Sequence, residues 1–277
     1  MTQDKMLQQS DSSASFTSNF SEDTQRKVFV FRHAERVDGT FRSELSHWTD
    51  RAFDEDGKYK PFDLNMPKML PKRHGGPQAF VDDTPLTELG YFHAVLTGKA
   101  LAMSGIEIHH VYASPALRSI QTANGIVEGL NQPNLKINVE IGLFEWTKFY
   151  EYLARWMTVE ELIAFKYHIN PHYESLHSKH ELKMDETIND WYTRSHDITS
   201  KILENSQGNI LIVGHRGSPY SCTTQLCGLP IPTEDDSDER VLKIQYLDGI
   251  HIEEHENGKY RYAKLPIPRF SCSSFTN

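Results

Sequence analysis

Short apolar runs alternate with longer amphipathic stretches along the chain after residue 26. Four runs have the length and residue types of buried strands: 27–31, 109–113, 136–140 and 209–213. Between them, apolar residues recur at three- to four-residue spacing, which predicts helices over 87–103, 114–130 and 187–205. Because strands that alternate with helices form parallel sheets, we expect an α/β fold: three layers, with a mostly parallel central sheet flanked by helices.

The helix over 87–103 has the clearest signals. Thr87 is a suitable N-cap, because its hydroxyl can accept a hydrogen bond from a free backbone N–H of the first turn. Leu89, Phe92, Leu96 and Ala100 recur at helical spacing. We therefore expect these four side chains to form the buried face of the helix.

Three other segments are assigned from local signals. Ser114-Pro115 is expected to open the second helix, since proline suits a first helical turn. Residues 151–185 are expected to be mostly helical with an interruption at Pro171, and residues 234–240 to form an acidic surface loop.

The chain is predicted to form one domain behind a tail. Residues 1–25 are rich in Ser, Gln and Asp and lack periodicity, so we expect a disordered, Ser-rich tail of unassigned role. The domain is expected to span 26–277. It contains an irregular insertion loop at about 37–85, long enough to serve as a lid or a substrate wall.

Composition narrows the class of protein. The 277 residues carry a formal net charge of −9, which disfavours broad nucleic-acid binding. No stretch has the apolar length of a membrane span, and the first residues do not resemble a signal peptide. The 3 cysteines are too few for a disulfide framework. These features predict a soluble cytoplasmic protein that binds neither membrane nor nucleic acid.

Polar residues with catalytic potential follow three of the predicted strands. Arg32-His33 follows the first, Ser114 to Arg118 follows the second, and Gly214-His215 follows the last. Ligands bind beyond the carboxyl ends of parallel strands, so we expect these groups in one pocket. Guanidinium groups match phosphate oxygens, and a neutral imidazole can attack phosphorus. The pattern therefore favours a phosphate site.

Four motifs in chain order resemble those of the histidine phosphatase superfamily, whose fold is phosphoglycerate mutase-like. They are RHAE at 32–35, PLTELG at 85–90, SPALR with QTA at 114–123, and GH at 214–215. Three further segments resemble the phosphatase domain of Sts/TULA (ubiquitin-associated and SH3 domain-containing) proteins and the insect ecdysteroid-phosphate phosphatases: RHAERVD at 32–38, DLNMPKMLPKR at 63–73 and GLFEWTKF at 142–149.

The resemblance implies phosphomonoester hydrolysis through a phosphohistidine intermediate. His33 is then the nucleophile and Glu145 the acid and base. The groups that hold the phosphoryl oxygens are Arg32, Arg36, Arg118 and His215. No cofactor or metal is implied. The expected substrates are aryl phosphates such as protein phosphotyrosine, or steroid phosphates, and the subfamily suggests a homodimer.

Alternatives remain open at this point. One is a phosphoglycerate mutase or sugar bisphosphatase, and another is a low-activity module that binds phosphorylated ligands. Arg216 either contacts phosphate or pairs with a surface carboxylate, and the pKa of Glu145 is undetermined. Aromatic residues at 41–62 and 146–150 either stack on substrate or belong to the core.

Other reactive residue types are given structural roles. A zinc site at His168, His172, His177 and His180 is disfavoured by Pro171, which breaks the helix that would align the first two. Cys222 and Cys227 are expected to be packing residues, because no phosphate-cradling CxxxxxR loop is present.

Overall fold

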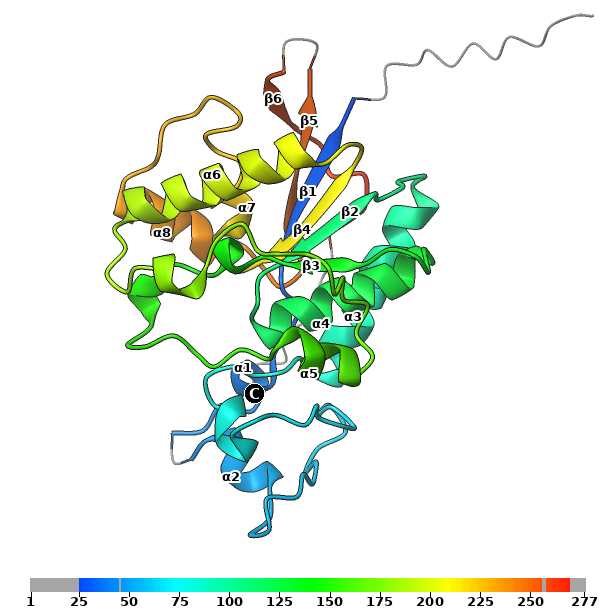
Figure 1. Ribbon diagram of the computed structural model, residues 1–277, viewed down its shortest axis with the longest axis vertical. Coiled ribbons are helices and arrows are strands. Elements are labelled where there is room, and N and C mark those ends of the chain that lie inside the picture. Colours follow the sequence, from blue (N-terminus) through cyan, green and yellow to red (C-terminus); the bar gives the residue numbers. More distant parts are fainter. Residues whose placement is uncertain (1–24, 45, 256–257, 270–277) are drawn as a thin grey trace, which may run out of the picture.

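A six-stranded sheet with helices on both faces forms the centre of the molecule (Figure 1). The computed structural model describes residues 25–44, 46–255 and 258–269, so the predicted tail lies almost wholly outside the described residues. The strands are β1 (Lys27–Arg32), β2 (His110–Ala113), β3 (Ile137–Val139), β4 (Ile210–Gly214), β5 (Gly249–Glu254) and β6 (Tyr260–Ala263). The helices are α1 (Val37–Thr40), α2 (Trp48–Ala52), α3 (Glu88–Met103), α4 (Leu117–Leu130), α5 (Val159–Ala164), α6 (Ile188–Asn205), α7 (Ser218–Ser221) and α8 (Glu234–Leu242).

The order of strands across the sheet is β3-β2-β4-β1-β5-β6. The first four are mutually parallel, whereas β5 and β6 are antiparallel to their neighbours. The prediction of a mostly parallel α/β sheet is therefore confirmed. The order also places β4, the last strand of the parallel set in sequence, between β2 and β1.

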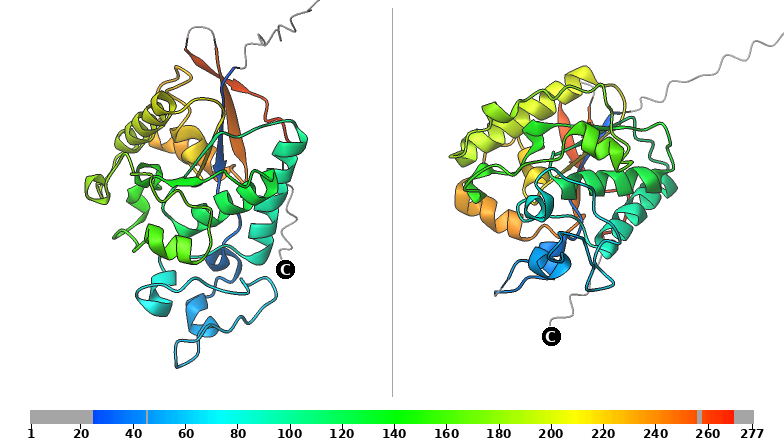
Figure 2. Two further views of the ribbon diagram at one scale, coloured as in Figure 1. Left: turned by 45° about the vertical axis from the view of Figure 1, so that its right-hand side comes forward. Right: turned by 60° about the horizontal axis from the view of Figure 1, so that its bottom comes forward.

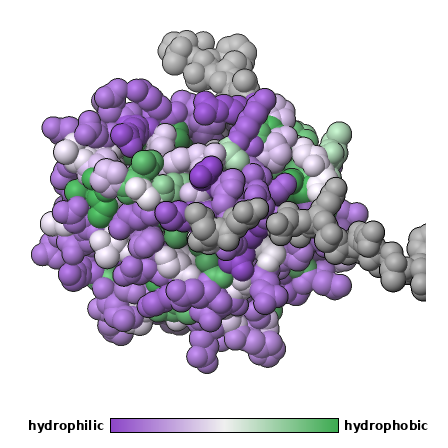
Figure 3. Space-filling model, turned by 90° about the horizontal axis from the view of Figure 1, so that it is seen from above, coloured by the Kyte–Doolittle hydropathy of each residue, from purple (hydrophilic) through white to green (hydrophobic). Residues whose placement is uncertain are grey.

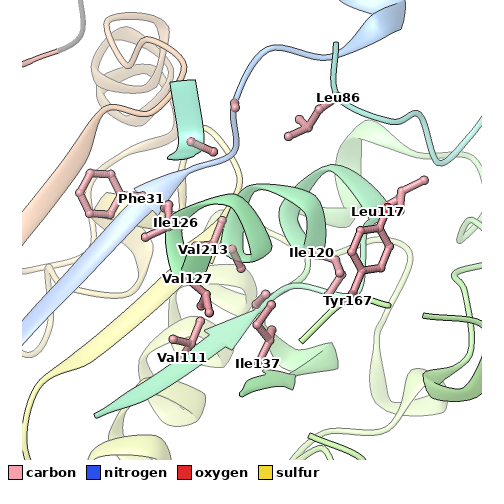
Figure 4. Close-up of a cluster of buried hydrophobic side chains, with 14 of the residues drawn as sticks. Phe31, Leu86, Val111, Leu117, Ile120, Ile126, Val127, Ile137, Tyr167 and Val213 are labelled. Carbon is pink, nitrogen blue, oxygen red and sulfur yellow. The ribbon is translucent and has the colours of Figure 1, made fainter. Parts of the chain in front are cut away.

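Alternating side chains along each strand separate two apolar layers. On one face, Phe29 and Phe31 pack with α3 and α4, and on the other, Val28 and Val30 pack with α6. Figure 4 shows α4 over the sheet on the first face, and Figure 2 shows from two further directions that α3 and α4 lie on one side of the sheet and α6 on the other. All four of these β1 side chains are fully buried, so β1 and the strands beside it form a rigid base for the residues that follow them.

The buried face of α3 differs from the prediction. Leu89 and Phe92 are 50% and 53% exposed, and the side that packs against α4 consists mainly of small residues. A Cβ on Gly98 would lie 2.1 Å from the carbonyl oxygen of Ile126, so the two helices are in backbone contact. The apolar spacing was a poor guide because close helix packing here depends on small side chains. The predicted N-cap is confirmed, since Thr87 Oγ1 accepts a hydrogen bond from Gly90 N.

Three boundary predictions were wrong. The segment 151–185 is mostly irregular and contains only α5 and the 3₁₀ turn η4 (Lys179–Glu181). The acidic segment at 234–240 lies in α8, whose first turn is acidic and therefore favourable to the helix dipole. Helix α4 begins at Leu117 rather than at Ser114-Pro115. At this first residue of the helix, the backbone N–H of Leu117 donates to the Asp83 carboxylate at 2.7 Å.

The segment between α1 and α3 is largely irregular and lies beyond the carboxyl ends of the parallel strands (Figure 1). It contains α2 and the 3₁₀ turn η1 (Gly76–Phe80). The rings of Trp48, Phe53 and Phe80 contact one another, with Phe53 stacked on Phe80 at 6.0 Å. These aromatics therefore form a local core.

Seen from above Figure 1, at the end of the molecule where β1 begins, the surface is mainly hydrophilic, with apolar residues scattered over it (Figure 3). Within the part of the chain that the structure describes, no helix has the length and apolar character needed to span a bilayer.

Candidate active site

The carboxyl ends of β1, β2 and β4 bring the predicted catalytic groups to one edge of the sheet. Arg32 is opposite Gly214 in the parallel register, and His33 N donates to the carbonyl of Gly214 at 2.9 Å. Ser114 N donates to the neighbouring carbonyl of Val213 at 3.0 Å. As a result, the rings of His33 and His215 lie edge to face with centroids 5.9 Å apart.

A cavity of about 800 Å³ opens at this edge. Its walls include five of the six predicted site residues: Arg32, His33, Arg36, Arg118 and Glu145. His215 is fully buried and is not part of the wall; it contacts Arg118 and Glu145 instead. The cavity is large enough for a phosphate group with a sizeable organic substituent.

His33 is held in the tautomer that a nucleophile needs. Its Nδ1 lies 2.8 Å from the carbonyl oxygen of Ala34, and a carbonyl can only accept, so Nδ1 carries the proton. The lone pair is therefore on Nε2. Burial, followed by the positive charges of Arg118 and Arg32, lowers the pKa of His33 well below its usual value. The ring is consequently neutral and nucleophilic near neutral pH.

Arg118 connects three other groups of the site. It is buried in the first turn of α4, and its Nη2 donates to Glu145 Oε2 at 3.2 Å, Tyr150 Oη at 3.0 Å and His215 Nδ1 at 3.0 Å. Although burial opposes the charge, Tyr150 and Glu145 raise the pKa of Arg118 above its usual value. The guanidinium therefore remains a fixed positive charge beside His33.

The other arginines differ in how they are held. Arg32 donates to the Ile244 carbonyl at 2.7 Å and stacks 4.1 Å from the centre of the Tyr246 ring. Burial, then the charge of Arg216, lowers its pKa to about 10, so it stays protonated near neutral pH. Arg36 is more exposed and pairs with Asp38 at 2.9 Å.

Arg216 also lines the cavity. Its Nε is buried and has no hydrogen-bond partner, and among the described residues no carboxylate pairs with it. The alternative in which Arg216 pairs with a surface carboxylate is therefore not seen in the described part of the chain, and its charge faces the same space as Arg32 and Arg36.

His215 has the opposite tautomer to His33. Arg118 can only donate, so Nδ1 of His215 accepts and Nε2 carries the proton, which is directed to Ser114 Oγ at 2.7 Å. Burial lowers the pKa of His215 to about 3. The ring is therefore neutral and fixed at both nitrogens, which keeps Arg118 in place.

Glu145 is a carboxylate in this environment. Burial raises its pKa, but the positive charge of Arg118 and the hydroxyl of Tyr150 lower it more strongly, to well below its usual value. Its side chain is 18% exposed, and its Oε2 accepts from Tyr150 Oη at 2.5 Å. The pKa of Glu145, which the sequence left undetermined, is therefore lowered rather than raised, and the side chain is ionised.

A buried ion pair fixes the loop that carries Glu145. Arg194 of α6 makes a two-pronged contact with Glu186, with Nε 2.6 Å from Oε1 and Nη2 2.7 Å from Oε2. Its remaining N–H groups donate to the carbonyls of Gly142, Phe144 and Glu145. Neither Arg194 nor Glu186 was singled out from the sequence, because no local motif marks the contact between Arg194 and a loop about 50 positions earlier in the chain.

The aromatic residues divide between cavity and core. Trp146, Phe149 and Tyr150 line the cavity, and Phe149 is 61% exposed. Trp146 is buried and stacks on Trp191 with ring centres 5.4 Å apart. The aromatics at 41–62 are not among the residues that line the cavity, so the core interpretation holds for them.

The other histidines and cysteines form no second reactive site in the described ranges. Within these, no group of three or more His, Cys, Asp or Glu side chains is arranged to hold a metal ion. Burial raises the pKa of Cys222, and that of Cys227 to about 11, which favours the unreactive thiol. Both side chains pack with the apolar layer beneath α6.

The chain is similar to known proteins over most of its length. A model of the histidine phosphatase superfamily (branch 1) matches residues 72–242. The chain is 36% identical to the ecdysteroid-phosphate phosphatase of Drosophila melanogaster over 263 residues, 91% of this chain and 34% of that protein. It is 40% identical to ubiquitin-associated and SH3 domain-containing protein B of Mus musculus over 250 residues, 88% of this chain and 39% of that protein. The chain thus spans less than half the length of these relatives.

A solved structure is similar over nearly its whole length. The ecdysone phosphate phosphatase from Bombix mori, crystallised in complex with tungstate, superposes with a TM-score of 0.79 at 32% identity. The similarity covers 91% of this chain and 97% of that one. It confirms the phosphoglycerate mutase-like fold predicted from the sequence.

Proposed function

The chain belongs to the histidine phosphatase superfamily, and we propose that it hydrolyses phosphomonoesters through a covalent intermediate on His33. One observation carries the proposal: the neutral, buried imidazole of His33 lies on the wall of the same cavity as three arginines. These are Arg32, Arg36 and Arg118. Fixed positive charges in a partly dry pocket stabilise a phosphoryl group in transfer without having to reorganise.

In the first step, Nε2 of His33 attacks phosphorus and the bond to the ester oxygen breaks. Since the Ala34 carbonyl holds the proton on Nδ1, the attacking ring becomes positively charged as its lone pair forms the P–N bond. The leaving oxygen takes a proton from Glu145. Because the pKa of Glu145 is lowered in the empty site, that proton enters with a substrate bound as the monoanion.

In the second step, water attacks the phosphohistidine. Glu145, now a carboxylate, takes the proton of the water, the P–N bond breaks, and His33 regains its neutral form. Inorganic phosphate takes this proton from Glu145 and leaves as the monoanion, so Glu145 is again a carboxylate and the enzyme returns to its starting state. His215 stays neutral in both steps and supports the site through its bonds to Arg118 and Ser114.

We assign the substrates either to aryl phosphates such as protein phosphotyrosine or to steroid phosphates, and these are the two classes to be compared. A phenol leaves with a pKa of about 10, so it needs less help from an acid than an alcohol does. The exposed ring of Phe149 and the rings of Tyr150 and Trp146 on the cavity wall support binding of a flat apolar group. The mutase and binding-module alternatives gain no specific support from the site.

The test is a hydrolysis panel on purified protein. Phosphotyrosine peptides, a steroid phosphate and a sugar phosphate are compared by phosphate release, with a 3-phosphoglycerate transfer assay beside them. Hydrolysis of aryl or steroid esters well above the sugar ester supports the proposal. Phosphate transfer without hydrolysis, or tight peptide binding without turnover, contradicts it.

Cytoplasmic location and a homodimer remain predictions. Light scattering of the purified protein would test the homodimer.

A further inference from the structure

A tyrosine hydroxyl is in direct contact with the proposed acid and base. Tyr150 lies just after the 3₁₀ turn η3 (Thr147–Phe149), and its backbone N–H donates to the Thr147 carbonyl at 2.9 Å. Its ring packs against Phe144 with centres 5.1 Å apart. These contacts place the hydroxyl 2.5 Å from Glu145 Oε2 and 3.0 Å from Arg118 Nη2.

The chemistry of the three groups fixes the direction of each hydrogen bond. Arg118 can only donate, so its Nη2–H donates to the oxygen of the Tyr150 hydroxyl. The hydroxyl proton is then free to go to the carboxylate of Glu145. Burial, followed by the negative charge of Glu145, raises the pKa of Tyr150, which keeps the hydroxyl protonated and therefore a donor.

These contacts all use the same oxygen of Glu145. Oε2 accepts from Tyr150 and from Arg118, and lies 3.5 Å from Nδ1 of His215. Among the described residues Oε1 has no hydrogen-bond partner, so it is the oxygen available to a substrate. Without the Tyr150 hydroxyl, Arg118 alone would hold the carboxylate at a single, longer contact.

We propose that Tyr150 is a positioning residue for proton transfer, which holds Glu145 by Oε2 so that Oε1 faces the ester oxygen and then the attacking water. The inference rests on the proposed function and extends it to a residue that contributes through Glu145. Proton transfer depends steeply on alignment, so a displaced carboxylate transfers its proton more slowly even when its pKa is favourable.

The test uses two esters that differ in their need for an acid. Phenyl phosphate releases a poor leaving group, whereas 4-nitrophenyl phosphate releases a more acidic phenol that can leave without a proton. We expect Tyr150→Phe to lower kcat/KM about 10-fold for phenyl phosphate and less than about 3-fold for 4-nitrophenyl phosphate. In a Glu145→Gln background, the same substitution should change either value less than about 2-fold, because the group that it positions is gone.

A matched control is available two residues away. Tyr152 borders the same cavity, but its hydroxyl contacts the carboxylate of Asp82 at 3.1 Å. Tyr152→Phe should therefore affect the two esters equally. Equal losses on both esters for Tyr150→Phe, or full additivity with Glu145→Gln, would show a merely structural role and overturn the proposal. A wild-type protein that hydrolyses neither ester overturns the proposed function as well, so the two failures are distinguishable.

Discussion

Replacing Arg194 by methionine removes the cation that holds the Glu145 loop while keeping most of the side-chain volume. The Arg194–Glu186 pair is almost completely buried, with side chains 6% and 3% exposed. Arg194→Met leaves the carboxylate of Glu186 in a buried position without its partner, which costs about 3–5 kcal/mol of folding free energy. In a chain of this size that corresponds to a fall in Tm of roughly 10 °C.

The same substitution also frees the backbone that carries the proposed acid. The carbonyls of Gly142, Phe144 and Glu145 lose their donors, so the carboxylate is no longer held at its position. A displacement of this kind lowers kcat/KM about 10²-fold. The double variant Arg194→Met/Glu186→Gln should regain about 1–3 kcal/mol of stability, since it removes the uncompensated charge, but not the activity.

Urea unfolding followed by circular dichroism measures the stabilities, and hydrolysis of 4-nitrophenyl phosphate measures the activities. Lys201→Met serves as the control, because Lys201 is an exposed residue of the same helix, and it should change stability by less than about 0.5 kcal/mol. A single variant within about 1 kcal/mol of wild type, or a double variant with wild-type kcat/KM, would show that the buried pair does not hold the Glu145 loop in place.

Further predictions concern packing, electrostatics and pH. Gly98→Ala places a Cβ 2.1 Å from the Ile126 carbonyl oxygen and should destabilise the protein by about 1–3 kcal/mol, measured by thermal unfolding. Arg118→Lys should lower kcat/KM about 10²-fold, because an ammonium group cannot reach Glu145, Tyr150 and His215 together, and the initial rate with aryl phosphate measures this. Because the folded-state pKa of His33 is lowered, its nucleophilic form persists on acidification, so kcat/KM should not fall between about pH 7 and pH 5 as it would for an ordinary histidine; a pH–rate profile checks this. The same lowered pKa makes the unfolded state bind more protons below about pH 6.5, so stability should decrease as the pH falls through that range, as urea unfolding at several pH values would show.

The sequence was sufficient for the four parallel strands and for the strand-end residues because both depend on local patterns, whereas β5 and β6 were not predicted. Buried strands are short apolar runs, and a parallel sheet brings their carboxyl ends together, so Arg32-His33 and Gly214-His215 could be paired across about 180 positions. The motifs then supplied Glu145, whose loop has no strand or helix pattern of its own.

Other features depend on contacts that no local pattern reveals. The packed face of α3 consists mainly of small residues, which allow the backbone of α4 to approach closely. Apolar spacing does not detect such a face, so it pointed to Leu89 and Phe92, which are exposed. Arg194 and Glu186 are ordinary polar residues until α6 is placed beside the Glu145 loop. The protonation states of Glu145 and His33 follow from burial and neighbouring charge, which the sequence does not contain.

The proposed mechanism requires that Nε2 of His33 forms the covalent bond to phosphorus. Rapid quenching during turnover of an aryl phosphate, followed by mass spectrometry and ³¹P NMR of the modified peptide, identifies the residue and the ring nitrogen that carry phosphate. We expect an acid-labile phosphate on Nε2 of His33, and its loss in His33→Ala together with a fall in turnover of about 10⁴-fold or more. Phosphate on another residue, or turnover retained by His33→Ala, would contradict it.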